Sequence, residues 1–260
     1  MNAAIDHALV LRSPRWLTHF SSPLFSQSTS SDYGSFTWPS AYVLAEYLWY
    51  MNRHMLQGRQ ILELGCGTGL PGLVAAACGA SVLLTDDEDV DIALKNARVS
   101  LLTNNPVTWT RQKLENQATP PTSEPIFLSS SKIAPFTWAS FSPQFLMEYC
   151  ERKWPDLIIA ADCFYDNAES FDAIFATLDF FFTKNPACTF ITSYQVRSSH
   201  KSLHRLAARW GFKSRNIGLD SDAGFSFPHH KYDFSQDIQL LEISPVNHMN
   251  IGGPQTKMEM

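Results

Sequence analysis

From residue 40 onward, stretches in which apolar residues recur every three or four positions alternate with short runs that are almost wholly apolar. The first pattern is typical of helices and the second of buried strands. Helical spacing over residues 41–51 predicts a helix that is capped by Ser40 and ends near His54. The short apolar runs predict strands at Ile61–Leu64, Ser81–Thr85, Leu157–Ala161, Thr189–Tyr194 and Ile238–Ile243.

Further helices are bounded by residues that favour helix ends. Pro71 and Gly79 are typical of the start and the end of a helix between the first two strands. The acidic run Asp86–Asp89 suits the positive N-terminal end of the next helix. Apolar residues spaced along 171–182 and 203–210 predict two more helices, the second of them ended by a glycine. Strands that alternate with helices predict an α/β sandwich around a mostly parallel sheet.

Length and composition predict one folded domain. The chain has 260 residues, and 45% of them are hydrophobic, which is enough for a sizeable core. We place this domain at residues 36–245, after a serine-rich, loose lead-in at 1–35 and before a flexible tail at 246–260. Residues 116–135 contain four prolines and three consecutive serines, which predicts a loop insertion.

The charge balance narrows the classes of partner. A net charge of −5 argues against a domain that binds nucleic acid through its phosphates. The longest apolar runs are far shorter than the roughly 20 residues that a membrane helix needs, and the N-terminus lacks the apolar segment of a secretion signal. We therefore expect no direct nucleic-acid partner, no membrane insertion and an intracellular location.

Cysteine and histidine positions argue against metal or disulfide chemistry. The five cysteines are an odd number without a C-x-x-C pair, as in proteins of a reducing compartment. His229-His230 has no cysteine or carboxylate at the spacing of metal ligands. We expect no bound metal.

The segment from Glu63 to Gly69 carries the most information about function. It follows the first predicted strand with the glycines Gly65, Gly67 and Gly69, at the edge where open α/β sheets bind their ligands. A dinucleotide fold requires G-x-G-x-x-G, but Leu70 occupies the third required position here. Glu63 would face a pyrophosphate unfavourably, whereas it suits a cationic ligand. The pattern thus disfavours NAD without excluding it.

S-adenosylmethionine matches these requirements. Its sulfonium and amino groups are positive, its carboxylate suits a helix N-terminus, and its ribose hydroxyls need an acceptor. Asp86 ends the second predicted strand 21 positions after Gly65, near the separation expected for an acid that binds ribose. In the alternative reading, the glycines form an ordinary tight turn and Asp86 only caps a helix. The joint register of strand, glycines, helix and acid favours the ligand site.

Several motifs together resemble methyltransferase family 16, a group of seven-strand, S-adenosylmethionine-dependent enzymes that mostly modify proteins. The resemblance covers about residues 33–244 and implies a Rossmann-like sandwich whose last strand is antiparallel. The matching elements are Tyr33-Gly34, Trp38-Pro39, the Glu63–Gly72 turn, Phe136-Thr137-Trp138 and Ala161-Asp162-Cys163-Phe164-Tyr165.

This resemblance implies roles for individual residues around the cofactor. Trp38 would lie against the methionine end of S-adenosylmethionine, which Glu63 and the glycine backbone would hold. Asp86 would take the ribose hydroxyls, Trp138 would pack near the adenine, and Ala161 would contribute main-chain contacts.

The resemblance also places Asp162 and Tyr165 where the acceptor side chain enters, as an Asp-x-x-Tyr element. Methyl transfer requires a neutral nitrogen, and both lysine and arginine are protonated at neutral pH. Asp162 could orient the nitrogen and receive its proton, while Phe164 and Tyr165 exclude water. A helix-capping role for Asp162 is the alternative. Within the family, one subgroup that this chain resembles often has phenylalanine at the position of Tyr165.

That subgroup shares Tyr194-Gln195-Val196-Arg197-Ser198 and Trp49 with this chain. It implies methylation of protein arginine, with histone H3 as the substrate and both nucleus and cytoplasm as locations. Lysine methylation, the commoner activity of the wider family, is the first alternative. The others are a catalytically silent adaptor of the same fold and a nicotinamide oxidoreductase.

Overall fold

A computed structural model describes residues 36–89, 91–103, 131–150, 153–165, 168–197, 202–218 and 238–246. Within these ranges a seven-stranded sheet has the order β3-β2-β1-β4-β5-β7-β6. The strands are β1 (Gln60–Leu64), β2 (Ser81–Asp86), β3 (Lys132–Pro135), β4 (Leu157–Ala161), β5 (Thr189–Gln195), β6 (Phe212–Asn216) and β7 (Ile238–Pro245). Strand β7 is antiparallel to both neighbours, and the other pairs are parallel. The predicted α/β sandwich with an antiparallel last strand is confirmed.

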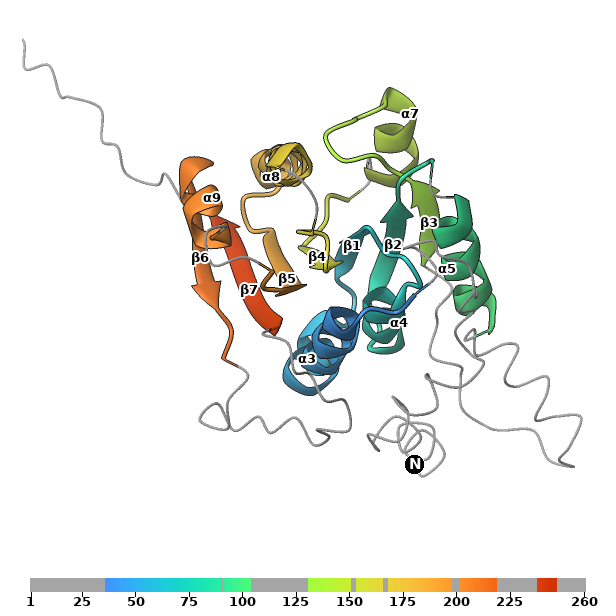
Figure 1. The fold of residues 1–260 in the computed structure, drawn as a ribbon. Helices are drawn as coiled ribbons and strands as arrows, with labels where there is room; N and C mark the ends of the chain where they lie inside the picture. The colour runs from blue at the N-terminus through green and yellow to red at the C-terminus, as the bar shows by residue number, and fades with distance from the viewer. Residues whose placement is uncertain are drawn as a thin grey trace, which may run out of the picture.

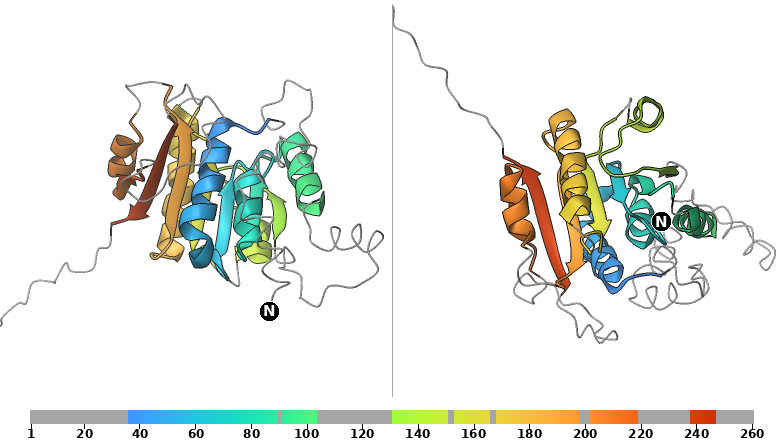
Figure 2. Two further views of the ribbon diagram at one scale, coloured as in Figure 1. Left: turned by 90° about the horizontal axis from the view of Figure 1, so that it is seen from below. Right: turned by 45° about the horizontal axis from the view of Figure 1, so that its top comes forward.

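Helices cover both faces of the sheet (Figures 1 and 2). They are α3 (Pro39–Leu56), α4 (Leu70–Ala77), α5 (Asp91–Thr103), α7 (Pro143–Phe145), the π-helix η2 (Leu146–Cys150), α8 (Ala168–Lys184) and α9 (Leu203–Arg209). Helices α3, α4 and α5 lie on one face, and α7, η2, α8 and α9 lie on the other. Each face has its own hydrophobic cluster, because neighbouring residues of a buried strand point to opposite sides.

The core is rich in aromatic side chains on the α8 face. Phe175 and Phe181 of α8 and Phe190 of β5 are fully buried. The apolar stripe of α8 that the sequence predicts therefore packs against the sheet, as expected for a helix with helical spacing of large apolar residues. Gly79 and Gly211 have positive φ directly after the ends of α4 and α9, which confirms both predicted helix stops.

Two local predictions need correction, and one strand was missed. Pro39 occupies the first turn of α3, so the N-cap is Trp38, and Ser40 lies within the helix without the predicted capping role. Residues 132–135 form β3, so the end of the predicted insertion belongs to the sheet. Strand β6 was not predicted, because only Phe212 in it is buried and the rest lacks an alternating apolar pattern.

Several predictions concern parts of the chain outside the described residues. These are the lead-in at 1–35, the tail from residue 247, His229-His230 and the insertion up to residue 130.

Glu46 on α3 is a buried acid on the face of the sheet opposite α8. Burial raises the pKa of its carboxyl to about 7. The pKa of a glutamate in the unfolded chain is about 4.3. The contribution of Glu46 to the free energy of unfolding is therefore full below about pH 4.3 and is lost as the pH rises through 7. We expect Glu46→Gln to raise Tm at pH 8 by about 2–4 °C and to leave Tm unchanged at pH 4. Thermal unfolding at the two pH values tests this, with the exposed Glu169→Gln as the control. An equal change at both pH values would contradict it.

The topology fixes where a ligand would bind. Strands β1, β2 and β3 follow one another toward one edge of the sheet, while β4 and β5 lie on the other side of β1. The order therefore reverses between β1 and β4, and open α/β sheets bind ligands at the carboxyl ends of the strands at such a point. The glycine turn follows β1 and Asp162 follows β4 directly, so both lie at this position (Figure 1).

Candidate active site

The turn between β1 and α4 requires glycine at three positions. Gly65, Gly67 and Gly69 have φ values of 57°, 51° and 80°, in the region that side chains with a Cβ rarely adopt. The Cys66 amide donates to the Thr85 carbonyl at 2.8 Å, which fixes the turn to β2. The turn is therefore a rigid element of the sheet edge and not a free loop.

The missing side chains of these glycines point in different directions. A Cβ on Gly65 would lie 2.7 Å from Cys163 Sγ and 3.3 Å from the Trp138 ring. A Cβ on Gly69 would lie instead 3.6 Å from Leu84, in ordinary contact with the core. Gly69 caps α4 and needs its positive φ for the turn. Of Gly65 and Gly69, Gly65 is the position where a side chain would meet a neighbour too closely.

Two carboxyl groups flank the turn. Glu63 on β1 is 1% exposed, and its Oε2 accepts a hydrogen bond of 3.0 Å from the Gly72 amide of α4. Asp86 ends β2, and its Oδ2 accepts a 2.7 Å hydrogen bond from the Gly67 amide. Its Oδ1 accepts another, of 2.9 Å, from the Asp87 amide. The glycine turn and the two acids predicted from the sequence thus form one connected group.

Within the described residues, neither carboxyl forms an ion pair with a basic side chain. Burial raises the pKa of Glu63 well above its usual range, the Gly72 amide lowers it, and the charge of Asp86 raises it again. Burial also raises the pKa of Asp86, against the two amides that donate to it. A positive ligand beside this pair would favour both charged forms. Cationic S-adenosylmethionine therefore fits the residues present, and the pyrophosphate of NAD does not.

Aromatic residues predicted to contact the cofactor border the same turn. Thr37 Oγ1 lies 2.9 Å from Thr68 Oγ1 and ties the segment before α3 to the glycine turn. This bond places the neighbouring Trp38 at the turn, where its ring also meets Phe36 edge-to-face at 5.4 Å. Trp138, from the loop after β3, lies on the other side beside Gly65. The Thr37–Thr68 bond could not be predicted, because two isolated threonines match no motif.

Asp162 follows β4 in a strained backbone conformation. Its φ is 58°, one of two positive values among the described residues other than glycine, and such strain is often found at functional sites. Its carboxylate accepts hydrogen bonds from the Gln195 amide and from the Arg197 guanidinium. Within the described residues, these bonds all come from the end of β5 and the two residues after it. They give no support to the alternative that Asp162 caps a helix.

The other residues of this element separate into core and surface. Ala161 is the last residue of β4. Phe164 is buried and its ring contacts those of Phe171, Phe175 and Tyr194, so it belongs to the aromatic core beside the site. Tyr165 is 50% exposed and lies at the surface. The shielding of the acceptor by these two residues stays a prediction.

The cysteines near the turn are packing residues. Cys66 and Cys163 are buried free thiols, and burial raises the pKa of each well above its usual range. Cys163 Sγ donates to the Leu64 carbonyl at 3.3 Å. A thiol with a raised pKa is a poor nucleophile, which agrees with the interpretation of both cysteines as small packing residues.

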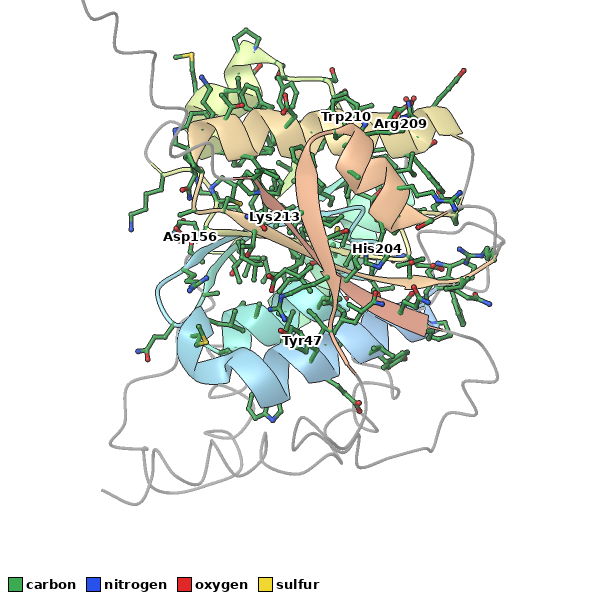
Figure 3. The ribbon with its side chains drawn as sticks, turned by 90° about the vertical axis from the view of Figure 1, so that its left-hand side faces the viewer. Tyr47, Asp156, His204, Arg209, Trp210 and Lys213 are labelled. Carbon is green, nitrogen blue, oxygen red and sulfur yellow. The ribbon has the colours of Figure 1, made fainter. Side chains whose placement is uncertain are left out.

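Two basic side chains, His204 on α9 and Arg215 on β6, have partners within the fold. The ring nitrogens of His204, labelled in Figure 3, lie 2.7 Å from Ser214 Oγ and 3.0 Å from Asn216 Oδ1. The Arg215 guanidinium binds the Glu242 carboxylate of β7 with bonds of 3.0 and 2.7 Å. These contacts hold α9 and the edge of the sheet together.

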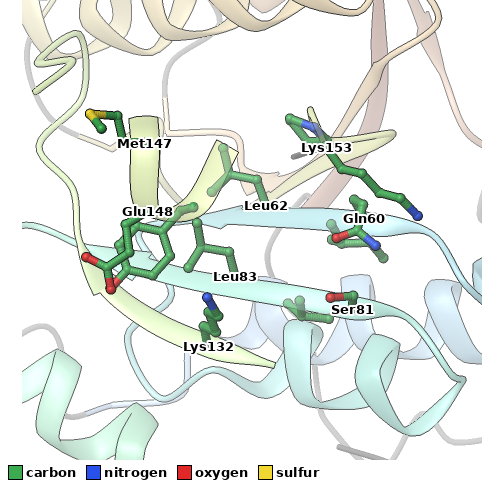
Figure 4. Close-up of a pocket in the computed structure, with 12 residues that line it drawn as sticks. Gln60, Leu62, Ser81, Leu83, Lys132, Met147, Glu148 and Lys153 are labelled. Carbon is green, nitrogen blue, oxygen red and sulfur yellow. The ribbon is translucent and has the colours of Figure 1, made fainter. Parts of the chain in front are cut away.

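A separate cleft of about 400 Å³ opens at the opposite end of the strands. It is lined by the first residues of three strands, Gln60, Ser81 and Lys132, and by Met147 and Lys153 (Figure 4). Since the glycine turn, Asp86 and Asp162 lie at the carboxyl ends, this cleft is not part of the candidate site. The described ranges contain no group of three or more His, Cys, Asp or Glu side chains able to hold a metal ion. No described helix combines the length and apolar character of a membrane span.

Comparisons with known proteins agree with this geometry. Residues 22–126 match the model of methyltransferase family 16, described as "Lysine methyltransferase". The human protein named "Histone-arginine methyltransferase METTL23" is 35% identical over 72% of this chain and 83% of its own length. The chain belongs to methyltransferase family 16. The mouse protein of the same name is 35% identical over 73% of this chain, and the match spans 64% of that protein.

Family 16 membership confirms the predicted activity class: the chain is an S-adenosylmethionine-dependent methyltransferase, and its cofactor is S-adenosylmethionine. Among solved structures, a TehB-like S-adenosylmethionine-dependent methyltransferase from Corynebacterium glutamicum is 13% identical, with a TM-score of 0.49, over 92% of this chain and 99% of its own.

Proposed function

We propose that this family 16 methyltransferase methylates arginine in proteins, with histone H3 as the substrate. The observation that carries the proposal is the 35% identity, over most of both chains, to a human protein named as a histone-arginine methyltransferase. The candidate site supports a basic acceptor through Asp162, whose carboxylate follows β4 at this edge of the sheet and can accept a hydrogen bond from an acceptor nitrogen. Lysine is the alternative acceptor, which the description of the family model favours.

The family resemblance suggests the residue roles in this proposal, and the contacts around the glycine turn support them. Asp86 would accept the ribose hydroxyls with the lone pairs that its two amide contacts leave open. Glu63 would face the positive methionine end, and the glycine turn would let the backbone approach the ligand closely. Trp38 and Trp138 would enclose the ligand from two sides, and Ala161 would line it with main chain.

The acceptor side of the mechanism rests on Asp162 and Tyr165. The cofactor supplies an electrophilic methyl group on a positive sulfur, so the protein has mainly to align a neutral nitrogen with it. A buried carboxylate at the end of β4 can accept a hydrogen bond from the acceptor nitrogen and take or relay the proton that leaves it. The half-exposed Tyr165 would border the entrance through which the acceptor arrives.

A methylation assay with mass-spectrometric mapping tests the proposed function. Purified full-length protein is incubated with radiolabelled S-adenosylmethionine and histone H3, and the labelled residue is then mapped. Label on an arginine supports the proposal, and label on a lysine of the same protein supports the alternative. Cofactor binding without label on histones would contradict the substrate assignment and leave the adaptor as the better account. We further propose that the protein occurs in nucleus and cytoplasm, which fluorescence imaging of the tagged chain tests.

A further inference from the structure

The Asp162 carboxylate is bound by the guanidinium of Arg197, a residue of the same chain. Arg197, two residues after β5, donates from its two terminal nitrogens to Oδ1 at 3.1 Å and to Oδ2 at 2.6 Å. The Gln195 amide donates to Oδ1 at 3.1 Å. This is the fork geometry in which a planar guanidinium binds a carboxylate with both nitrogens. The ends of β4 and β5 are thereby joined at the place proposed for the acceptor.

The pair differs from an ordinary surface ion pair in its burial. The side chain of Asp162 is 4% exposed and that of Arg197 is 35% exposed. In the similar pair Arg215–Glu242 on the edge strands, the exposures are 64% and 22%. An exposed pair contributes little, whereas removing one partner of a buried pair leaves an uncompensated charge. Arg197 thus matters to Asp162 far more than Arg215 matters to Glu242.

The bonds to Asp162 also limit what its carboxylate can offer a substrate. A carboxylate has about four acceptor positions. From the described residues, two bonds occupy Oδ1 and one occupies Oδ2, which leaves one position, on Oδ2. With Arg197 in place, Asp162 can take a single hydrogen bond from one nitrogen and cannot bind a second guanidinium in a fork.

We propose that Arg197 is a positioning residue of the methyl-transfer site: it fixes the Asp162 carboxylate so that one lone pair of Oδ2 orients one acceptor nitrogen. The inference deepens the proposed function and rests on it. Because Arg197 does not touch the reacting atoms, its loss affects turnover more than cofactor binding. It also assigns a role to the Tyr194–Ser198 motif that the sequence singles out.

The test compares Arg197→Ala, Arg197→Lys and the control Arg215→Ala. Arg215 also binds a carboxylate with two nitrogens, Nε and one terminal nitrogen, at the edge of the sheet. We expect Arg197→Ala to lower kcat roughly 100-fold, as misplacement of a reacting group does, with the affinity for S-adenosylmethionine nearly unchanged. Millimolar guanidinium chloride should restore part of this loss, since it can fill the empty fork, and ammonium chloride should not. Arg197→Lys should retain intermediate activity, and Arg215→Ala should match the wild type.

A second readout separates this proposal from the proposed function. Millimolar guanidinium should raise Tm of Arg197→Ala but not of the wild type or of Arg215→Ala, whether or not histones are substrates. If the wild type methylates no histone while this selective rise is seen, the substrate assignment fails and the fork at Asp162 stands. Turnover of Arg197→Ala within twofold of an active wild type would overturn the positioning role. A loss that guanidinium does not restore, without a selective rise in Tm, would also overturn it.

Discussion

Gly65→Arg should abolish binding of S-adenosylmethionine, and Gly65→Ala should weaken it by at least about tenfold. A Cβ at this position would lie 2.7 Å from Cys163 Sγ, closer than side chains approach one another, and φ is 57°. Either the backbone or the buried Cys163 side chain must therefore shift at the point where the ligand is expected to bind, and a cost of about 1.4 kcal/mol already corresponds to a tenfold loss. Isothermal titration calorimetry with S-adenosylmethionine measures the effect.

Gly58→Ala provides a matched control for backbone strain. Gly58 has a φ of 75°, but a Cβ there meets no atom within 4 Å. Both alanine variants force a side chain into the left-handed region, which costs about 1–2 kcal/mol, so both should lower Tm. Only the Gly65 variant should lose cofactor affinity. Equal affinity of the two variants for S-adenosylmethionine would contradict a close approach of the ligand at Gly65.

Asp162→Asn should reduce turnover by roughly 10²- to 10⁴-fold, the range lost with a general acid–base group. Affinity for S-adenosylmethionine should remain close to that of the wild type. Asparagine is the suitable replacement because Asp162 has a φ of 58°, a conformation that asparagine tolerates and alanine does not. Single-turnover kinetics with the protein substrate measure the loss of turnover, and calorimetry measures the affinity for S-adenosylmethionine.

Asp156→Asn is the control for Asp162→Asn. Asp156 precedes β4 at the other end of the strand, where its Oδ2 accepts a 2.9 Å hydrogen bond from the Gln60 amide. This variant also removes a carboxylate bonded to a neighbouring strand, so it should cost stability without a comparable loss of turnover. Turnover retained in Asp162→Asn would exclude Asp162 from the chemistry.

Much of the fold follows from patterns that are local in the chain. Strands β1 and β2 and helix α4 could be predicted because apolar runs, three glycines and Pro71 lie within about 25 residues of one another. The two acids at the turn could be predicted for the same reason, since Glu63 is the next-to-last residue of β1 and Asp86 the last of β2, and these strands are adjacent in both sequence and sheet. Local signals of this kind do not depend on long-range packing.

Features that depend on distant or irregular segments could not be predicted. Strand β6 has the sequence Phe-Lys-Ser-Arg-Asn with one buried residue, so it lacks the alternation that marks a strand. Strand β3 follows a proline-rich segment that masks its short apolar pattern. The bond between Asp162 and Arg197 joins residues 35 positions apart. It exists because β4 and β5 are parallel neighbours that end at the same edge.

Calorimetric titration of the wild type and of Asp86→Ala with S-adenosylmethionine tests the cofactor site most directly. We expect one binding site in the wild type. We expect a loss of about 10- to 100-fold in affinity in Asp86→Ala, because hydrogen bonds to a charged acceptor are each worth about 1.5–3 kcal/mol. No heat of binding in the wild type, or equal affinity in both proteins, would contradict a cofactor site between the glycine turn and Asp86.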